Sequence, residues 1–221
     1  MITLHHLNNS RSQRILWLLE ELGVPYEIRH YQRDRKTQLA PPELKKVHPL
    51  GKSPVITDDG VTVAESGAII EYLVRKYGTQ FRPAEDSPAF LDYTYWMHFA
   101  EGSLMPPLVM KLVFDKVREA PVPFFIKPVT KGIADKVMSS FVGPNIRGNL
   151  DFIEAHLAKH PWFAGDALSG ADFQLSFPLE AAMAGRAAGG HYPAIKAWVK
   201  KVQERPAYQR GLKAGGPYDY A

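Results

Sequence analysis

The order of the elements predicted in the first third of this sequence restricts its possible folds more than any other feature. Apolar runs rich in β-branched residues predict strands at 2–7, 26–31, 54–57 and 61–64. Helices are predicted at 12–22, at 43–47 and from Glu65-Ser66 to about 77. Asp58-Asp59-Gly60 is typical of a tight turn between antiparallel strands and would join the last two strands. The resulting β-α-β-α-β-β-α order predicts a small α/β domain.

The rest of the chain is predicted to contain only helices. In 79–88, two prolines and several polar residues interrupt the periodicity, which is typical of a linker between domains. The helices that follow are expected at 89–117, within 124–160, at 171–185 and at 195–205. We therefore predict an α/β domain at 1–80 and an all-helical domain at 88–221.

Two further features concern the ends of the predicted helices. Ser169 and Asp172 have the spacing of a capping box, in which two side chains satisfy the first free N–H groups of a helix. The glycine-rich segment 211–221 lacks such support. We expect it to be frayed or to lie over the surface.

The composition excludes several classes of function. The 221 residues include no cysteine, which rules out disulfides, a cysteine-ligated metal and a nucleophilic thiol supplied by the protein. The net charge of +4 comes without a run of five or more Lys or Arg residues, so we expect no nucleic-acid partner. There is no stretch of 18 apolar residues and no N-terminal signal pattern. We therefore expect no membrane association and a cytoplasmic location.

Gly51-Lys52-Ser53 matches the last three residues of a phosphate-binding loop, but the surrounding sequence does not fit one. Such a loop needs a glycine five positions before Gly51, where this chain has Lys46. It also leads directly into a helix, whereas here Pro54 and a predicted strand follow. His5 and His6 are adjacent in a predicted strand, so they point to opposite faces and cannot chelate one ion together. The sequence also lacks the H-E-x-x-H, G-x-S-x-G and G-x-G-x-x-G motifs. We expect neither a metal nor a resident cofactor.

Three stretches of the first domain carry groups suited to binding a small charged ligand. The loop Asn8–Arg11 places hydroxyl and amide groups beside the free N–H groups of the first helix, which can stabilise an anion. Lys52-Ser53-Pro54 starts a strand with a proline, which leaves backbone groups of Ser53 available to an extended peptide. Glu65-Ser66 combines a carboxylate for a ligand's ammonium group with helix N–H groups for a ligand's carboxylate.

Together these stretches resemble the glutathione transferase family. The similarity covers nearly the whole chain and is carried by SRSQRILWLLEELGVPYE, HPLGKSPVI, AESGAIIEYL, SGADF and IKAWVKKVQERPAY. It implies a thioredoxin-like N-terminal domain followed by an all-α helical bundle. In the family, the proline matching Pro54 is cis, and the backbone of the residue matching Ser53 pairs with the cysteinyl part of glutathione. The residues matching Glu65 and Ser66 hold the γ-glutamyl end of glutathione. Lys52 matches a position whose side chain often helps to bind the carboxylates of glutathione.

The classes of this family stabilise the glutathione thiolate with a tyrosine, a serine or a cysteine near the end of the first strand. This chain has no cysteine, and its first tyrosine, Tyr26, already belongs to the second strand. The resemblance is therefore to cytosolic, serine-type members of bacterial or fungal kind, with Ser10 as the best match. Ser12 and the amides of Asn8 and Asn9 are alternatives.

The resemblance implies a glutathione S-transferase that activates the thiol of glutathione for attack on hydrophobic electrophiles. Glutathione is then a co-substrate and not a cofactor. The second substrate would lie against Trp96 and Phe99, in a stretch that also contains Met105 and Met110. The family also implies a homodimer. The alternatives are glutathione-dependent peroxide or disulfide reduction, dehalogenation, and a non-catalytic binding or regulatory protein of the same fold.

Overall fold

A four-stranded mixed sheet organises the first part of the chain. In the computed structural model, which describes residues 1–186 and 190–221, the strands are β1 (Ile2–Leu7), β2 (Tyr26–Tyr31), β3 (Val55–Asp58) and β4 (Val61–Ala64). Their order is β2-β1-β3-β4, with β1 and β2 parallel and β3 antiparallel to both of its neighbours. The predicted strands are confirmed. The third begins at Val55 because Pro54 has no N–H to donate to a neighbouring strand.

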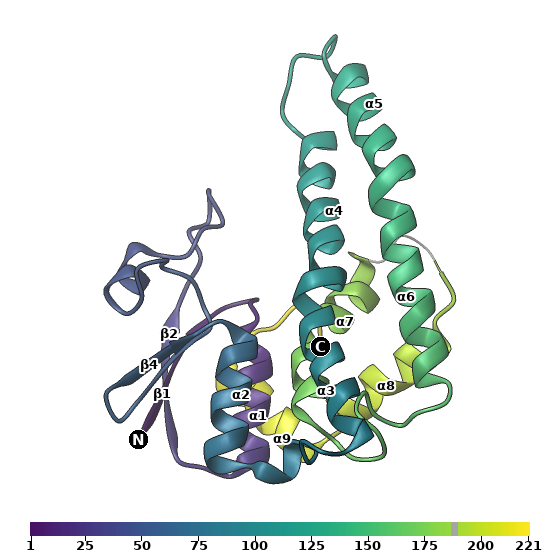
Figure 1. The fold of residues 1–221 in the computed structure, drawn as a ribbon. Coiled ribbons are helices and arrows are strands. Elements are labelled where there is room, and N and C mark those ends of the chain that lie inside the picture. The colour runs from purple at the N-terminus through teal and green to yellow at the C-terminus, as the bar shows by residue number, and fades with distance from the viewer. Residues whose placement is uncertain (187–189) are drawn as a thin grey trace.

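Two helices lie between this sheet and the rest of the molecule (Figure 1). They are α1 (Ser12–Leu22) and α2 (Ser66–Tyr77), both at their predicted positions. Gly23 ends α1 with a φ of +64°, in the left-handed region that glycine adopts without strain. The short helix predicted at 43–47 is a 3-10 turn at Pro42–Lys46 that buries Leu44. We call residues 1–77 the sheet part.

The chain from residue 88 onward, the helical part, forms only helices within the described residues, as predicted. They are α3 (Pro88–Phe99), α4 (Met105–Arg118), α5 (Lys127–Val137), α6 (Gly143–Leu157), α7 (Gly170–Ala181), α8 (Pro193–Gln203) and α9 (Pro206–Gly215). A wider π-type turn at Ala100–Leu104 divides α3 from α4, and another at Met138–Val142 divides α5 from α6. Each is soon followed by a proline, which cannot donate the hydrogen bond of a regular helix. In the part of the chain that the structure describes, no helix has the length and apolarity needed to cross a bilayer.

The helix α7 is the buried centre of the helical part, because all of its residues are buried. The capping box predicted at its start is confirmed. Asp172 accepts hydrogen bonds from the N–H of Ser169 at 2.9 Å and from the N–H of Phe163 at 3.1 Å. Burial raises the pKa of Asp172 to about 6, although these hydrogen bonds oppose the rise. One carboxyl group therefore fixes both the first turn of α7 and the loop before it.

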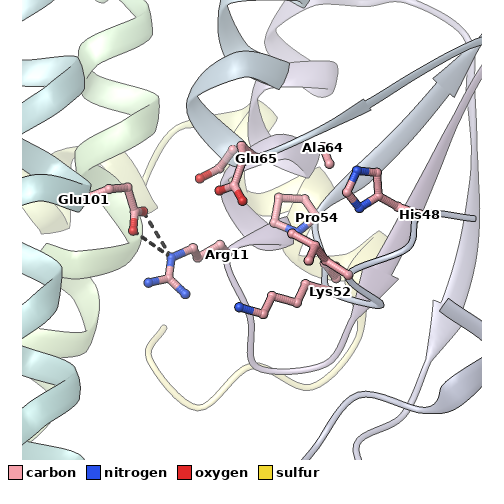
Figure 2. A pocket seen from close by; sticks show the side chains of 10 residues that line it. Arg11, His48, Lys52, Pro54, Ala64, Glu65 and Glu101 are labelled. Carbon is pink, nitrogen blue, oxygen red and sulfur yellow. Dashed lines mark hydrogen bonds and ion pairs between the residues drawn. The ribbon is translucent and has the colours of Figure 1, made fainter. Parts of the chain in front are cut away.

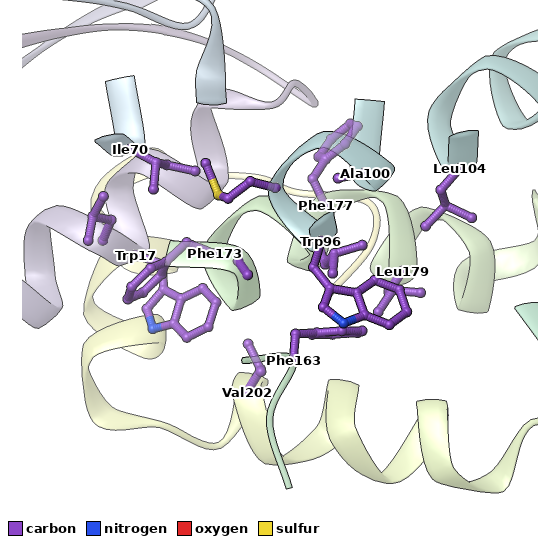
Figure 3. Close-up of a cluster of buried hydrophobic side chains, with 14 of the residues drawn as sticks. Trp17, Ile70, Trp96, Ala100, Leu104, Phe163, Phe173, Phe177, Leu179 and Val202 are labelled. Atoms are coloured by element: carbon purple, nitrogen blue, oxygen red, sulfur yellow. The ribbon is translucent and has the colours of Figure 1, made fainter. Parts of the chain in front are cut away.

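A single hydrophobic core joins the sheet part to the helical part (Figure 3). Trp17 of α1 is fully buried and packs edge-on against Phe173 of α7, with ring centroids 4.4 Å apart. Phe173 also meets Phe81, in the connection between the two parts, at 5.3 Å. Aromatic pairs of this kind contribute about 0.5–1.5 kcal/mol beyond the area that they bury. The two parts therefore pack as one unit.

The segment 211–221, expected to be frayed or superficial, is helical up to Gly215. There α9 packs along α1 and buries Gly211 and Gly215. A Cβ at Gly211 would lie 3.2 Å from backbone atoms of Leu16 and Trp17, so glycine here permits a close approach of two helices. The expectation is wrong for 211–215 because helix packing outweighs the low helix propensity of glycine.

We predict that Gly211→Ala destabilises the protein by about 1–3 kcal/mol, because the added methyl group forces α9 away from α1. The matched control is Gly132→Ala in α5, where an added Cβ meets no atom within 4 Å. This change should stabilise by about 0.5–1 kcal/mol through helix propensity alone. Urea unfolding of both variants measures the difference. Equal stabilisation by the two substitutions would contradict the proposed close contact.

Candidate functional site

A cavity opens where the loop before β3 meets the start of α2 (Figure 2). We call it the Pro54 cavity, and its volume is about 190 Å³. Its lining residues are Arg11, His48, Leu50, Lys52, Ser53, Pro54, Ala64, Glu65, Ser66 and Glu101. The structure therefore brings together in one cavity the residues from two separate motifs that the sequence singled out as glutathione ligands.

The loop on one side of this cavity is shaped by Gly51 and by the peptide bond between Ser53 and Pro54. Gly51 has a φ of +58°, and a Cβ at this position would lie 2.7 Å from the Cγ of Lys45. The Ser53–Pro54 bond is cis, as the resemblance implies. The Ser53 hydroxyl donates to the carbonyl of His5 at 2.8 Å. This hydrogen bond ties the loop to β1 and fixes the position of the residue before the proline.

Glu65 and Ser66 stand where β4 passes into α2. Glu65 has φ 71° and ψ 123°, a conformation that is uncommon for residues other than glycine and is often found at functional sites. Its carbonyl accepts from the N–H of Ile69 at 2.9 Å and so begins the helix. Figure 2 shows its side chain directed into the cavity. The cavity thus offers a carboxylate for an ammonium group and helix N–H groups for a carboxylate.

An ion pair that the sequence did not reveal closes the opposite side of the Pro54 cavity. The Nε–H of Arg11 points at both carboxylate oxygens of Glu101, at 3.1 and 3.0 Å. Glu101 lies in the turn between α3 and α4, so only the tertiary fold brings it to Arg11. Burial alone would raise the pKa of Glu101, but the charges of Arg14 and Arg11 hold it below its usual range. Glu101 is therefore ionised at neutral pH.

Arg14 holds the same carboxylate from inside the protein. It is 1% exposed, and it donates to Glu101 at 3.0 Å and to the side-chain oxygen of Gln174 at 2.7 Å. Burial lowers the pKa of Arg14 to about 10, which still leaves it protonated at pH 7. Two guanidinium groups therefore share one carboxylate at the edge of the cavity.

A larger cavity lies between the first loops of the chain and α4. We call it the α4 cavity, and its volume is about 700 Å³. Its lining residues are Asn8, Asn9, Ser10, Arg11, Arg33, Thr37, Gln38, Leu39, Ser53, Met105, Val109, Leu112, Lys116, Phe177, Asp219 and Tyr220. One side is apolar and comes from Met105, Val109 and Leu112 of α4, with Phe177 and Tyr220 beyond them. Such a wall suits an organic molecule of low polarity.

Ser10 lines the α4 cavity, whereas Ser12 lines neither cavity. The Ser10 Oγ lies 2.8 Å from the Ser12 Oγ and accepts the Ser12 N–H at 3.2 Å. Ser12 is fully buried and hydrogen-bonds to the Nδ1 of His6 at 2.9 Å. Burial lowers the pKa of His6 to about 4, so the ring is neutral at pH 7.

The Asn8 side chain accepts the N–H of Arg33 at 2.9 Å, which holds the neighbouring loop.

The last residues of the chain form a wall of the α4 cavity. Asn9 donates from Nδ2 to the carboxylate of Asp219 at 2.7 Å and accepts the Asp219 N–H at 3.0 Å. Tyr218 donates to the buried carboxyl group of Glu180 at 2.6 Å. These contacts hold Tyr220 at the cavity. The side chain of Asn9 is thus occupied with the end of the chain.

Trp96 and Phe99, expected to border the second substrate, do not line the α4 cavity. Trp96 is 2% exposed and packs against Phe163 at 4.8 Å and Phe152 at 5.3 Å, as part of the core in Figure 3. Phe99 lies 5.1 Å from the Trp96 ring in the same cluster. Both side chains are buried, and neither reaches that cavity. The helix α3 turns these side chains inward, and the next helix supplies the wall, beginning with Met105.

The histidines of β1 do not form a metal site. The Nδ1 of His5 lies 2.9 Å from the hydroxyl of Tyr31, while His6 on the other face bonds to Ser12. Within residues 1–186 and 190–221, no group of three or more His, Asp and Glu side chains is arranged to hold a metal ion.

Comparisons with known proteins agree with this architecture. The chain matches the family described as glutathione S-transferase, N-terminal domain, over residues 1–75, and its C-terminal domain over 135–206. It is 46% identical to glutathione S-transferase 3 of Schizosaccharomyces pombe, over 94% of this chain and 85% of that protein. It is 36% identical to glutathione S-transferase 1 of Saccharomyces cerevisiae, over 94% of this chain and 92% of that protein. The crystal structure of a glutathione S-transferase from Actinobacillus pleuropneumoniae is 33% identical, with a TM-score of 0.77, over 96% of this chain and 92% of that one.

We predict that Asn9→Gly loosens the end of the chain without unfolding the protein. Asn9 has a φ of +47°, which glycine adopts easily, so the substitution removes mainly the two hydrogen bonds to Asp219. Each is worth about 1 kcal/mol, so amide hydrogen exchange in 216–221 should quicken about five- to thirtyfold. Gln38→Gly, at a φ of +61° on a separate loop, is the matched control. Unchanged exchange in the Asn9 variant would show that other contacts hold this wall.

Proposed function

Since the chain belongs to the glutathione S-transferase family, we propose that the Ser10 hydroxyl donates a hydrogen bond to the sulfur of glutathione and stabilises its thiolate. Glutathione transfer is the activity of this chain. The observation that supports Ser10 is its position. It lines the α4 cavity directly beside Arg11, a residue that lines both cavities.

Glutathione is placed in the Pro54 cavity by its charged ends. The γ-glutamyl end carries an ammonium group and a carboxylate, which match the Glu65 carboxylate and the N–H groups at the start of α2 beside Ser66. The ammonium group of Lys52 is available for the remaining carboxylate. The cysteinyl residue then passes the backbone of Ser53, which lines both cavities, so that its thiol reaches the α4 cavity.

Ser10 contributes by making the thiolate easier to form. A free thiol has a pKa near 8.5, and a hydrogen-bond donor lowers it because the donor prefers the charged sulfur. The hydroxyl of Ser12 lies 2.8 Å from that of Ser10 and donates to the carbonyl of Leu7 at 3.2 Å. The Ser10 hydroxyl can rotate to direct its own proton to the sulfur. The thiol proton passes to water. The thiolate then forms a carbon–sulfur bond with the electrophile, and the displaced electron pair leaves with the leaving group or moves to an electron-withdrawing substituent.

The second substrate is a hydrophobic electrophile bound in the α4 cavity. Met105, Val109 and Leu112 supply apolar surface opposite the loop that carries Ser10. Holding both reactants in adjoining cavities converts a collision between two free molecules into a reaction of bound partners.

We also propose a cytoplasmic homodimer. Three large apolar side chains are exposed on neighbouring faces of α3 and α6, namely Leu91 at 75%, Tyr95 at 47% and Phe152 at 48%. The rings of Tyr95 and Phe152 lie 6.1 Å apart, so they belong to one patch. Such a patch is often covered by another protein surface. Sedimentation velocity on the chain and on Tyr95→Glu tests this assembly.

We predict that Ser10→Ala raises the pKa of bound glutathione by about one to two units, because a hydrogen bond to a charged group is worth about 1.5–3 kcal/mol. Turnover near neutral pH should fall about ten- to a hundredfold. The ultraviolet absorbance of the thiolate, followed against pH, measures the effect. Ser10→Thr keeps the hydroxyl group and is the matched control. An unchanged pKa in the alanine variant would remove the role from Ser10, and a native protein that binds glutathione without forming thiolate would be a binding protein.

We predict that Glu65→Gln raises the KM for glutathione about ten- to a hundredfold, because a charge-assisted hydrogen bond to the ammonium group is lost. The turnover number at saturating glutathione should change much less. Glu43→Gln is the control, since Glu43 is exposed and lines neither cavity. Steady-state kinetics with a chloronitroaromatic substrate provide the measurement. Equal effects of the two substitutions would place the γ-glutamyl end elsewhere.

A further inference from the structure

The two cavities meet at two residues. Of all the residues that line them, only Arg11 and Ser53 line both. If glutathione occupies the Pro54 cavity and the electrophile occupies the α4 cavity, the reacting sulfur must lie where the cavities join, because reacting atoms have to come within about 3–3.5 Å of each other. The side chain of Arg11 is therefore next to the sulfur.

The guanidinium group of Arg11 is held in place by one edge only. Its Nε donates to Glu101, at 3.0 and 3.1 Å from the two oxygens. Within the described chain, its two terminal nitrogens make no hydrogen bond to protein. Figure 2 shows them pointing away from Glu101, on the side of the cavity where the ammonium group of Lys52 lies. The group also lies 5.8 Å from the ring centre of Phe177, which belongs to the α4 cavity.

The charges around this point leave a positive excess. Glu101 is the carboxylate that Arg11 and Arg14 share, and Arg14 is fixed deeper in the protein by Gln174. Arg11 is therefore only partly neutralised. Its side chain is 35% exposed, so it can reach a ligand without losing its contact with Glu101. The hydroxyl of Ser10, by contrast, has a single proton and can donate only one hydrogen bond to the sulfur.

We propose that Arg11 is a further catalytic residue, whose terminal nitrogens donate to the glutathione sulfur and whose charge stabilises the thiolate. The proposal rests on the proposed function, since it requires glutathione in the Pro54 cavity. Arg11 gives up no proton in this role. The S–H bond breaks and its proton goes to water, while Arg11 and Ser10 stabilise the negative charge left on sulfur. When the carbon–sulfur bond forms, that charge disappears and the hydrogen bonds from Arg11 weaken.

The test compares Arg11→Gln, Arg11→Lys and Lys36→Gln in the intact protein. Arg11→Gln should raise the measured pKa of bound glutathione by about one unit, because a charge-assisted hydrogen bond becomes a neutral one. Arg11→Lys keeps the charge and should preserve most of the effect. Lys36→Gln removes an exposed cation that lines neither cavity and should leave the thiol pKa unchanged. The turnover of Arg11→Gln should drop about tenfold at pH 6.5 and much less at pH 9, where the thiolate forms without help.

A second measurement separates this role from simple ligand binding. S-methylglutathione has no ionisable thiol, so its affinity for Arg11→Gln should stay within about threefold of the native value. A large loss of its affinity with an unchanged thiol pKa would make Arg11 a carboxylate ligand and overturn the proposal. If Ser10→Ala raises the thiol pKa but neither Arg11 variant does, the proposed function stands and the inference about Arg11 fails. If the native protein binds no glutathione, both fail together.

Discussion

The buried charge of Arg14 is the constraint on which the arrangement of this molecule depends. A guanidinium group that is 1% exposed must be paired, since an unpaired charge in the interior costs several kcal/mol. Its partners, Glu101 and Gln174, belong to the helical part, while Arg14 belongs to the first helix of the sheet part. The way the two parts pack therefore brings both partners to this charge. The contact between Trp17 and Phe173 adds apolar area to the same interface.

The functional site follows from that interface. The sheet part supplies the cis peptide before Pro54 and the carboxylate of Glu65, which form a cavity suited to a charged peptide. The helical part supplies α4 and the end of the chain, which add a larger and partly apolar cavity. Because Glu101 holds both Arg14 and Arg11, the residue that fixes the two parts together also positions a cation where the cavities join. The packing of the two parts and the position of Arg11 thus depend on the same carboxylate.

Local rules predicted most of the elements and singled out residues that line the Pro54 cavity. The strands, α1, α2 and the capping box at Ser169 follow from periodicity, turn residues and side-chain to backbone hydrogen bonds, which act over a few positions. The same rules did not predict α9, because the contact of Gly211 with α1 is a contact between distant segments. They also could not predict that Trp96 and Phe99 are buried. An aromatic side chain on a predicted helix can face the core or a cavity, and only the packing of the neighbouring helices decides between them.

The sequence by itself determined the classes of chemistry open to this protein. The absence of cysteine, the position of Ser10 and the pair Glu65-Ser66 are properties of the chain that no folding can change. The tertiary structure alone decided that Arg11 meets Glu101, that Asn9 meets Asp219, and that α4 forms the wall of the second cavity. Each of these contacts joins residues about 90 to 210 positions apart. At such separations the sequence carries no periodicity or spacing that links the partners, and their meeting depends on how the helices bury their charges and apolar faces.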